Sequence, residues 1–332
     1  MQSPLLVLHI GAGNHPEILN SKYRQVIRKA LSQQQGSRDG KLVVLAAAEI
    51  LDECPLVNSG YGSSLNISGN VNNDASFLAF EGSTMIRYNC LYNIDHNYPL
   101  RETVRLFDSI DALFDQKSLD SIGLVKPKVL DYTARHYVYQ QLSGDVVNEP
   151  PPIHPSQQRF FDKYKNFLEA DAHSVQDTIG LIHIDGPKTH LAASSGGNFL
   201  KLPGRVGCAA VVGAGVGYRA VDEFEVSCLC SGNGEDIILL NLANFMTTLV
   251  RADSGVDSVP GMVRQAWESI RTLSDKLYVG VVLVINDKVN GCKRLIYYHT
   301  TETFYFGYHY RNSKVVLSRL TGNYVVGEVI LR

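Results

Sequence analysis

The feature that most constrains this chain is an abrupt change of composition at Thr178. The preceding stretch, Glu149 to Asp177, is polar and contains prolines, whereas Thr178 to Ile184 is a nearly continuous apolar run. Such a run is typical of a buried strand, which would begin at the threonine itself. A threonine hydroxyl is a poor nucleophile without a neighbouring base, and a free α-amine on the same residue can be that base. Cleavage between Asp177 and Thr178 would create this amine.

The alternative interpretation of Thr178 is a loop residue that precedes a strand of β-branched residues. A predicted hairpin argues against this alternative. Residues 185–188 read Asp-Gly-Pro-Lys, a turn sequence that separates the first apolar run from a second one beginning at Thr189,. With the turn centred on its glycine and proline, Ile184 faces Thr189. The same count places Thr178 opposite Ser195, with Cβ atoms about 4.5–5.5 Å apart. A second hydroxyl is therefore expected beside the first, unless the register slips by one residue.

Composition excludes several classes of protein. The chain has 332 residues, six cysteines without the spacing of a disulfide framework, and a net charge of −2. Such a charge does not draw a protein broadly to nucleic acid or to anionic membranes, and free cysteines fit a reducing compartment. No apolar stretch approaches the roughly 20 residues that span a bilayer, and Leu5 to Ile10 is too short for a signal peptide. We expect a cytoplasmic enzyme, with the nucleus left open, that binds neither nucleic acid nor membrane.

Hydrophobic periodicity predicts helices and strands on both sides of Thr178. The expected helices cover Pro16 to Gln33, Leu42 to Cys54, Pro99 to Phe114, Gln158 to Leu168, Glu235 to Leu249 and Val259 to Leu277,. The expected strands are Leu5 to Ile10, Val71 to Phe80, Met85 to Tyr92, Thr178 to Ile184, Thr189 to Ser194, Ala209 to Val212 and Glu223 to Cys230, with three more closing the chain,. This distribution predicts one α+β domain over residues 1–332, in which the cut is not a domain boundary.

Five short motifs, in one order and spacing, carry a family resemblance. They are DTIG from Asp177, SSGG from Ser194, PGRVG from Pro203, GAGVGY from Gly213 and SGNGE from Ser231. Together with HIGAG at 9–13 and PLVNSGYGSSLN at 55–66, they resemble the N-terminal-nucleophile asparaginase-like hydrolases over about residues 5 to 260. The resemblance implies an αββα sandwich made of an alpha fragment, 1–177, with a mobile linker at about 149–177, and a beta fragment, 178–332. Whether two such αβ units form a homodimer is left open.

Three departures from most asparaginases resemble one branch of the family. Asp177 stands where they have glycine, Ser195 and Ser231 where they have threonine, and Cys208 where they have aspartate. All three look like taspase, the threonine aspartase, an endopeptidase that cuts after aspartate. In free asparagine the attacked carbonyl is two carbons from the α-carboxylate, as the main-chain carbonyl of a peptide aspartate is from its side-chain carboxylate. One arginine, Arg205, can therefore hold either substrate.

The resemblance also implies a role for each site residue. Thr178 would be the nucleophile, Ser231 and the Gly232 N–H would stabilise the oxyanion, Ser195 would orient the threonine and its amine, and Asn58 would support them. Arg205, Cys208 and Gly234 would line the substrate pocket. Before cleavage, Asp177 would occupy that pocket as the enzyme's first substrate, with Arg205 on its carboxylate. Because a peptide nitrogen is neutral, whereas free asparagine carries an ammonium, Cys208 in place of aspartate fits a polypeptide substrate.

No metal or organic cofactor is expected. Cys228 and Cys230 lie on one face of a predicted strand, and no CxxC pair exists,. Gly213 to Gly217 lacks the third glycine of a nucleotide-binding motif, and His9 is interpreted as a core histidine without a chemical role. Whether a sodium or other monovalent ion stiffens the loop from Asn58 to Asn66, as in relatives, is left open.

Three hypotheses about function follow. The first is a self-processing threonine endopeptidase that cleaves polypeptides after aspartate. The second is an L-asparaginase or isoaspartyl dipeptidase, which Cys208 disfavours but does not exclude, because backbone carbonyls can hold an ammonium. The third is a non-catalytic protein that keeps the fold and never cuts itself. Substrates separate the first two, and the intact mass of the purified chain tests the third.

Overall fold

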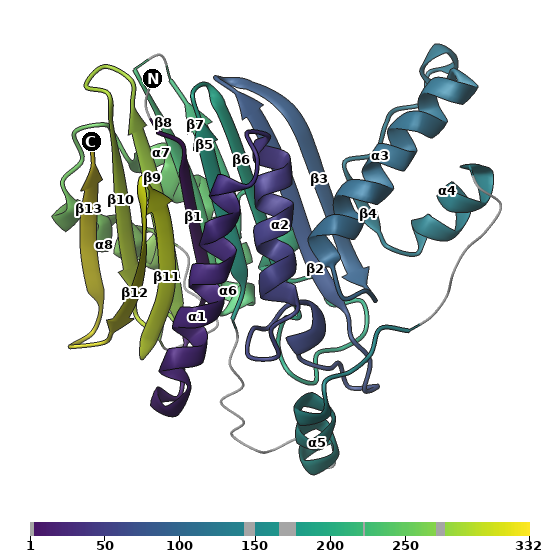
Figure 1. Cartoon of the computed structure of the whole chain (residues 1–332), viewed down its shortest axis with the longest axis horizontal. Coiled ribbons are helices and arrows are strands. Elements are labelled where there is room, and N and C mark those ends of the chain that lie inside the picture. Colours follow the sequence, from purple (N-terminus) through teal and green to yellow (C-terminus); the bar gives the residue numbers. More distant parts are fainter. Residues whose placement is uncertain (1–2, 143–149, 166–176, 222, 270–275) are drawn as a thin grey trace.

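Two β-sheets stacked face to face form the centre of the structure (Figure 1). The structure is a computed structural model that describes residues 3–142, 150–165, 177–221, 223–269 and 276–332. The larger sheet contains β1 (Leu5–Gly13), β2 (Asn73–Glu81), β3 (Thr84–Ile94), β4 (Val129–Asp131), β5 (Ile179–Asp185), β6 (Lys188–Ser195), β11 (Thr303–Tyr310) and β12 (Asn312–Arg319). The smaller contains β7 (Val216–Ala220), β8 (Phe224–Gly232), β9 (Val279–Asp287), β10 (Cys292–His299) and β13 (Val325–Leu331). Their strand orders are β12-β11-β1-β5-β6-β2-β3-β4 and β13-β10-β9-β8-β7.

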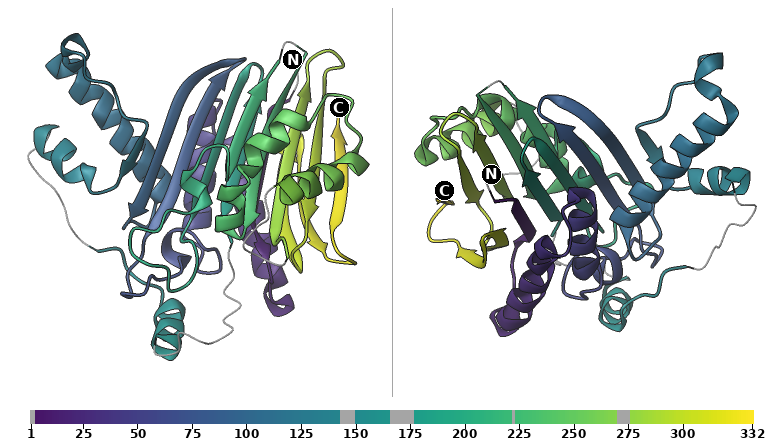
Figure 2. Two further views of the ribbon diagram at one scale, coloured as in Figure 1. Left: turned by 180° about the vertical axis from the view of Figure 1, so that it is seen from behind. Right: turned by 45° about the horizontal axis from the view of Figure 1, so that its top comes forward.

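Helices cover the outer faces of both sheets (Figure 2). They are α1 (Asn20–Leu31), α2 (Gly40–Asp52), α3 (Pro99–Lys117), α4 (Ala134–Leu142), α5 (Pro155–Tyr164), α6 (Gly234–Leu239), α7 (Leu242–Leu249) and α8 (Val259–Ser269). Short 3-10 helices are η1 (Glu17–Leu19), η2 (Ser32–Gln35), η3 (Gly60–Gly62), η4 (Leu119–Ile122), η5 (Cys208–Ala210) and η6 (Val256–Ser258). Helices α1, α2 and α3 pack on the larger sheet, and α7 packs on the smaller one.

Three apolar clusters hold these layers together. One lies between α1, α2, α3 and the larger sheet, a second between α7, α8 and the smaller sheet, and a third between the two sheets. Strands β1 and β9 are buried along their whole length, because each has neighbours on both edges and a covered surface on both faces. Burial of this apolar area is the main force that stabilises the layers. The predicted αββα sandwich is therefore confirmed.

The hairpin that follows Thr178 has the predicted register. Strands β5 and β6 pair antiparallel, with Ile184 opposite Thr189 and Ile179 opposite Ser194. Gly186 adopts a φ of +55° in the turn, a conformation that costs glycine little and other residues more. The register brings Ser195 to the level of Thr178, which stands directly before the first residue of β5.

Some local predictions were wrong. Residues 209–212 do not form a strand: η5 occupies the start of this segment, and the next strand is β7, which was missed. The predicted helix over 235–249 is two helices, because Asn241 has a φ of +47° between α6 and α7. The N–H of Asn244 donates to the Gly213 carbonyl at 2.7 Å, so a tertiary contact starts the second helix. Five strands, rather than three, follow residue 277 in the described chain.

The linker prediction is only partly testable. Helix α5 is a short helix in this region, beginning three residues earlier than predicted, whereas residues 149 and 166–176 lie outside the described ones. The end of the helix predicted over Val259 to Leu277 also falls partly outside them. Within the described ranges, no helix is long and apolar enough to cross a membrane.

Candidate active site

Thr178 lies where the two sheets meet, and its side chain and backbone are almost completely buried. Its backbone N–H donates to the Ser231 hydroxyl at 3.2 Å. Ser231 is at the end of β8 in the smaller sheet, and its hydroxyl also accepts the N–H of Ala12, on β1, at 3.1 Å. One hydroxyl of the smaller sheet thus contacts β1 and the residue directly before β5, both belonging to the larger-sheet side of the site.

The carbonyl oxygen of the peptide bond between Asp177 and Thr178 also contacts a serine hydroxyl. The Ser195 hydroxyl donates to the Asp177 carbonyl oxygen at 3.1 Å and accepts the Gly197 N–H at 3.0 Å. The predicted register placed Ser195 beside Thr178. In the structure the Ser195 hydroxyl contacts Asp177, the residue before Thr178. The amide nitrogen and carbonyl oxygen of the predicted scissile bond each therefore contact a serine hydroxyl.

Asn58 supports this serine through the backbone. Its side-chain N–H donates to the Gly197 carbonyl at 2.9 Å, its side-chain oxygen accepts the Ser64 N–H at 2.8 Å, and its carbonyl accepts the Gly196 N–H at 2.9 Å. A Cβ on Gly196 would stand 2.5 Å from the Asn58 side-chain oxygen. The asparagine-glycine loop and the SSGG motif therefore fit together only with glycine at this position.

Cys208 adjoins Thr178. Its buried thiol lies within hydrogen-bonding reach of the Thr178 side chain. Burial raises the pKa of Cys208 to about 12, although the nearby Arg205 guanidinium favours the thiolate,. The thiol is consequently neutral near pH 7, and the position carries no negative charge.

Arg205 lies among glycine residues, and only part of its guanidinium group is hydrogen-bonded to the described residues. Its Nε donates to the Glu235 carboxylate at 2.8 Å, whereas its Nη2 is buried without a hydrogen-bond partner among the described residues. A Cβ on Gly234 would stand 2.8 Å from that Nη2, and one on Gly197 would stand 3.0 Å from Nη1. A buried guanidinium N–H requires an acceptor, so the arrangement can receive an anionic group.

Sequence reasoning missed two charged pairs around the arginine. Glu235 follows Gly234 directly and could have been noticed as the end of the SGNGE motif. Lys201 Nζ lies 3.5 Å from the buried Asp74 carboxylate, which also accepts the Gly207 N–H at 2.7 Å. Burial raises the pKa of Asp74, against the effect of Lys201. This pair ties the loop that carries Arg205 to β2.

Gly232 and His9 complete the surroundings of Thr178. Gly232 has a φ of +130°, and a Cβ there would stand 2.2 Å from the Tyr278 carbonyl oxygen. The His9 ring hydrogen-bonds to the Thr178 backbone, and burial lowers the pKa of His9 to about 3. His9 is therefore a neutral contact of the Thr178 backbone rather than only a core residue.

The predicted partner of Asp177 was wrong. Its carboxylate Oδ2 lies 3.2 Å from His15 Nε2, with both side chains completely buried, whereas Arg205 pairs with Glu235. The reason is the direction of the chain: the Asp177 side chain enters the space beside Gly11, where a Cβ would stand 2.3 Å away.

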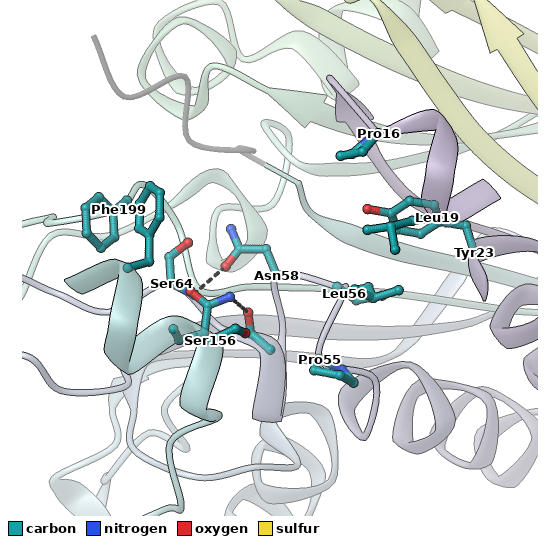
Figure 3. Close-up of a pocket in the computed structure, with 13 residues that line it drawn as sticks. Pro16, Leu19, Tyr23, Pro55, Leu56, Asn58, Ser64, Ser156 and Phe199 are labelled. Carbon is teal, nitrogen blue, oxygen red and sulfur yellow. Dashed lines mark hydrogen bonds between the residues drawn. The ribbon is translucent and has the colours of Figure 1, made fainter. Parts of the chain in front are cut away.

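A cavity of about 420 Å³ adjoins Asn58. Figure 3 shows Phe199 on one side, Leu19 and Tyr23 on the other, and Asn58 between them. Helix α5 closes one wall: Gln157 donates to the Gly62 carbonyl at 3.0 Å, and the Phe160 ring meets Phe199 edge to face with centroids 4.5 Å apart. The lining is mainly apolar and aromatic, which suits peptide side chains.

The described residues show no cluster of three or more His, Cys, Asp or Glu side chains suited to a metal ion. All six cysteines are free thiols. Cys228 and Cys230 lie on one face of β8, as predicted, with sulfurs 3.8 Å apart. The question of a monovalent ion in the loop from Asn58 to Asn66 stays open.

Comparisons with known proteins agree on one family. A family model described as asparaginase matches residues 138–312, which include Thr178 and Arg205. The plant-type L-asparaginase of Pyrobaculum calidifontis is 30% identical over 251 residues, covering 72% of this chain and 77% of the relative. That of Pyrococcus abyssi is 24% identical, covering 74% and 79%. The isoaspartyl peptidase/L-asparaginase of Xenopus laevis is 28% identical, covering 73% and 74%.

Proposed function

Since this chain belongs to the asparaginase family of N-terminal-nucleophile hydrolases, we propose that it cuts itself before Thr178 and then hydrolyses amide bonds with Thr178 as nucleophile. The observation that carries the proposal is the setting of one peptide bond: its N–H donates to Ser231 and its carbonyl accepts from Ser195. Both groups of the bond are held, and the attacking hydroxyl is on the residue itself.

In turnover, the free α-amine of Thr178 takes the hydroxyl proton as the oxygen attacks the substrate carbonyl carbon. The Ser231 hydroxyl and the Gly232 N–H stabilise the oxyanion. The amine then gives the proton to the departing nitrogen, and an ester on Thr178 remains. Water, activated by the same amine, splits the ester and regenerates the hydroxyl.

Arg205 selects the substrate in this proposal. Its buried Nη2 lacks an acceptor, and a carboxylate two carbons from the attacked carbonyl would supply one. A bidentate guanidinium–carboxylate pair is a strong, directional interaction. Aspartyl and asparaginyl compounds have this spacing.

One candidate activity is that of an L-asparaginase or isoaspartyl peptidase. It is supported by the activities that the relatives' names state, and these relatives align with about three quarters of this chain. In this candidate Arg205 holds the α-carboxylate and backbone carbonyls hold the ammonium. The comparisons support this activity more directly than any other.

The second candidate is an endopeptidase of taspase type that cuts after aspartate. Three local observations favour it: the neutral Cys208 beside the nucleophile, an aspartate at position 177, and the apolar cavity next to Asn58. A neutral thiol cannot pair with a substrate ammonium, whereas a peptide nitrogen needs no such partner.

The test begins with the intact mass of purified chain. The proposal predicts fragments of 177 and 155 residues that stay associated, and an unbroken chain for Thr178→Ala. Cleavage of that variant at the normal rate would exclude Thr178 as the agent. Mature protein is then assayed with free asparagine, β-aspartyl dipeptides and peptides containing one aspartate. Turnover of the small substrates alone supports the first candidate, cleavage after aspartate supports the second, and no turnover at all contradicts both.

A further inference from the structure

A closed pocket holds the carboxylate of Asp177 in the uncut chain, away from Arg205. The side chains of Asp177 and His15 are completely buried, with Oδ2 3.2 Å from Nε2. Neither carboxylate oxygen has a hydrogen-bond partner among the described residues. A charge buried in this way is strongly unfavourable without a charged partner. His15 is the basic side chain that the structure places against it.

The hydrogen bonds of His15 orient its ring toward Asp177. The Thr303 hydroxyl donates its one hydrogen to the Gly13 carbonyl at 3.0 Å. Its distance of 2.7 Å to His15 Nδ1 is therefore a bond in which Nδ1 donates,. Nε2 is consequently the ring nitrogen that faces the Asp177 carboxylate.

The tyrosines around the pocket are neutral. Tyr23 of α1 and Tyr305 of β11 meet the His15 ring edge to face, with centroids 5.0 and 5.1 Å away. Burial raises the pKa of Tyr23 above its ordinary value, with a smaller contribution from Asp177, and burial likewise raises the pKa of Tyr278. The phenols of Tyr23 and Tyr278 therefore stay uncharged near neutral pH, so neither is a charged partner for the Asp177 carboxylate.

We propose that His15 is a positioning residue for self-processing: it holds the Asp177 side chain and thereby fixes the neighbouring carbonyl for attack by Thr178. The inference rests on the proposed self-cleavage. In this proposal His15 binds the Asp177 carboxylate during self-cleavage, whereas Arg205 binds the substrate carboxylate in the mature enzyme. His15 touches no reacting atom and acts through Asp177.

The step itself is an acyl shift followed by hydrolysis. The Thr178 Oγ bonds to the Asp177 carbonyl carbon, the carbon–nitrogen bond breaks, and the hydroxyl proton ends on the freed amine. Water then splits the ester, which yields the Asp177 α-carboxylate with a released proton and restores the Thr178 hydroxyl. No reactant other than water is needed. Rotation of Asp177 about its own bonds would move the carbonyl from Ser195, and His15 restrains that rotation.

The experiment follows the full chain from cell-free synthesis and measures its conversion to two fragments over time. His15→Ala is expected to slow conversion at least tenfold, and His15→Gln, whose amide can still donate to the carboxylate, less than that. His183→Gln is the matched control, since His183 is equally buried and neither ring nitrogen has a hydrogen-bond partner among the described residues. It should convert at the wild-type rate.

Coupling to Asp177 separates positioning from a general structural effect. In the Asp177→Ala background, His15→Ala should change the conversion rate less than twofold, because the group it holds is gone.

Several results would overturn the inference. One is a conversion rate of His15→Ala within twofold of the wild-type rate. Another is an equal effect of His15→Ala on that rate with and without the Asp177 side chain. A third is a loss of turnover, per mole of matured His15→Ala protein, as large as its loss of conversion rate. Arg205→Ala should show the reverse pattern, with normal conversion and lost turnover. Failure of wild type to convert, or conversion of Thr178→Ala, would defeat the proposed self-processing as well, so the two failures can be told apart.

Discussion

The thiol of Cys208 lies within hydrogen-bonding reach of the Thr178 side chain, at the position where the resemblance to asparaginases predicts an aspartate. Burial keeps this thiol neutral by raising the pKa of Cys208 to about 12. In the proposed mechanism a neutral side chain therefore lies next to the reacting oxygen, where it bears on the choice between an ammonium-bearing amino acid and a neutral peptide.

Restoring a carboxylate should shift the substrate preference. Cys208→Asp is expected to raise kcat/KM for free asparagine about tenfold relative to aspartyl peptides, equivalent to about 1.4 kcal/mol for a new ion pair with the ammonium. Cys208→Ser is the control, because it is small and neutral and should give no gain. A serine variant that gains as much as the aspartate variant would show that charge is not the cause.

Arg205→Ala should lose at least about 30-fold in kcat/KM, because a buried substrate carboxylate without its partner costs about 2 kcal/mol or more. Arg205→Lys should recover little, since an ammonium lacks the planar fork. The melting temperature should change little, because the ion pair with the half-exposed Glu235 adds little stability,. Unchanged catalytic efficiency in Arg205→Ala would place the carboxylate receptor elsewhere.

The aromatic cavity should matter only for extended substrates. Phe160→Ala removes one ring of the edge-to-face pair with Phe199 and is expected to raise KM for aspartyl peptides about fivefold to tenfold, through loss of roughly 1 kcal/mol of apolar contact. Leu202→Ala, at an exposed position, is the control. KM for free asparagine should stay the same in both variants, and an equal rise for both substrates would exclude the cavity as a peptide subsite.

Acid should destabilise the fold through His183. Burial, assisted by the neighbouring His190, lowers the pKa of His183 from 6.5 to about 4. Between these values the unfolded chain takes up a proton that the folded chain excludes, so the free energy of unfolding falls as the pH drops from 6.5 toward 4, by at most about 3 kcal/mol. Urea titrations at pH 7.5 and pH 5 measure the loss, which should be smaller in His183→Gln. An equal loss in that variant would assign it to other groups.

Local sequence patterns were sufficient to predict the hairpin of β5 and β6 and to locate the glycine residues of the site. The turn at residues 185–188 sets a register of period two, and that register alone brought Ser195 level with Thr178,. The apolar run from Thr178 to Ile184 likewise predicted a buried strand, which is β5. The resemblance added Arg205 and Asn58, and the structure places Asn58 against the SSGG motif and Arg205 among the glycines that follow it.

Other features depend on residues far apart in the chain, and no local pattern encodes them. His15 meets Asp177, and Lys201 meets Asp74, only because the sheet brings their strands and loops together; a single carboxylate in the sequence does not reveal which cation it will face. Asn241, with its φ of +47°, interrupts a helix that the periodicity favours, and the Gly213 carbonyl accepts the N–H of Asn244 at the start of the next helix. Chain direction, set by the packing of the two sheets, decided that Asp177 turns toward Gly11 and His15, and so separated the carboxylate of the uncut chain from the arginine that the sequence had paired with it.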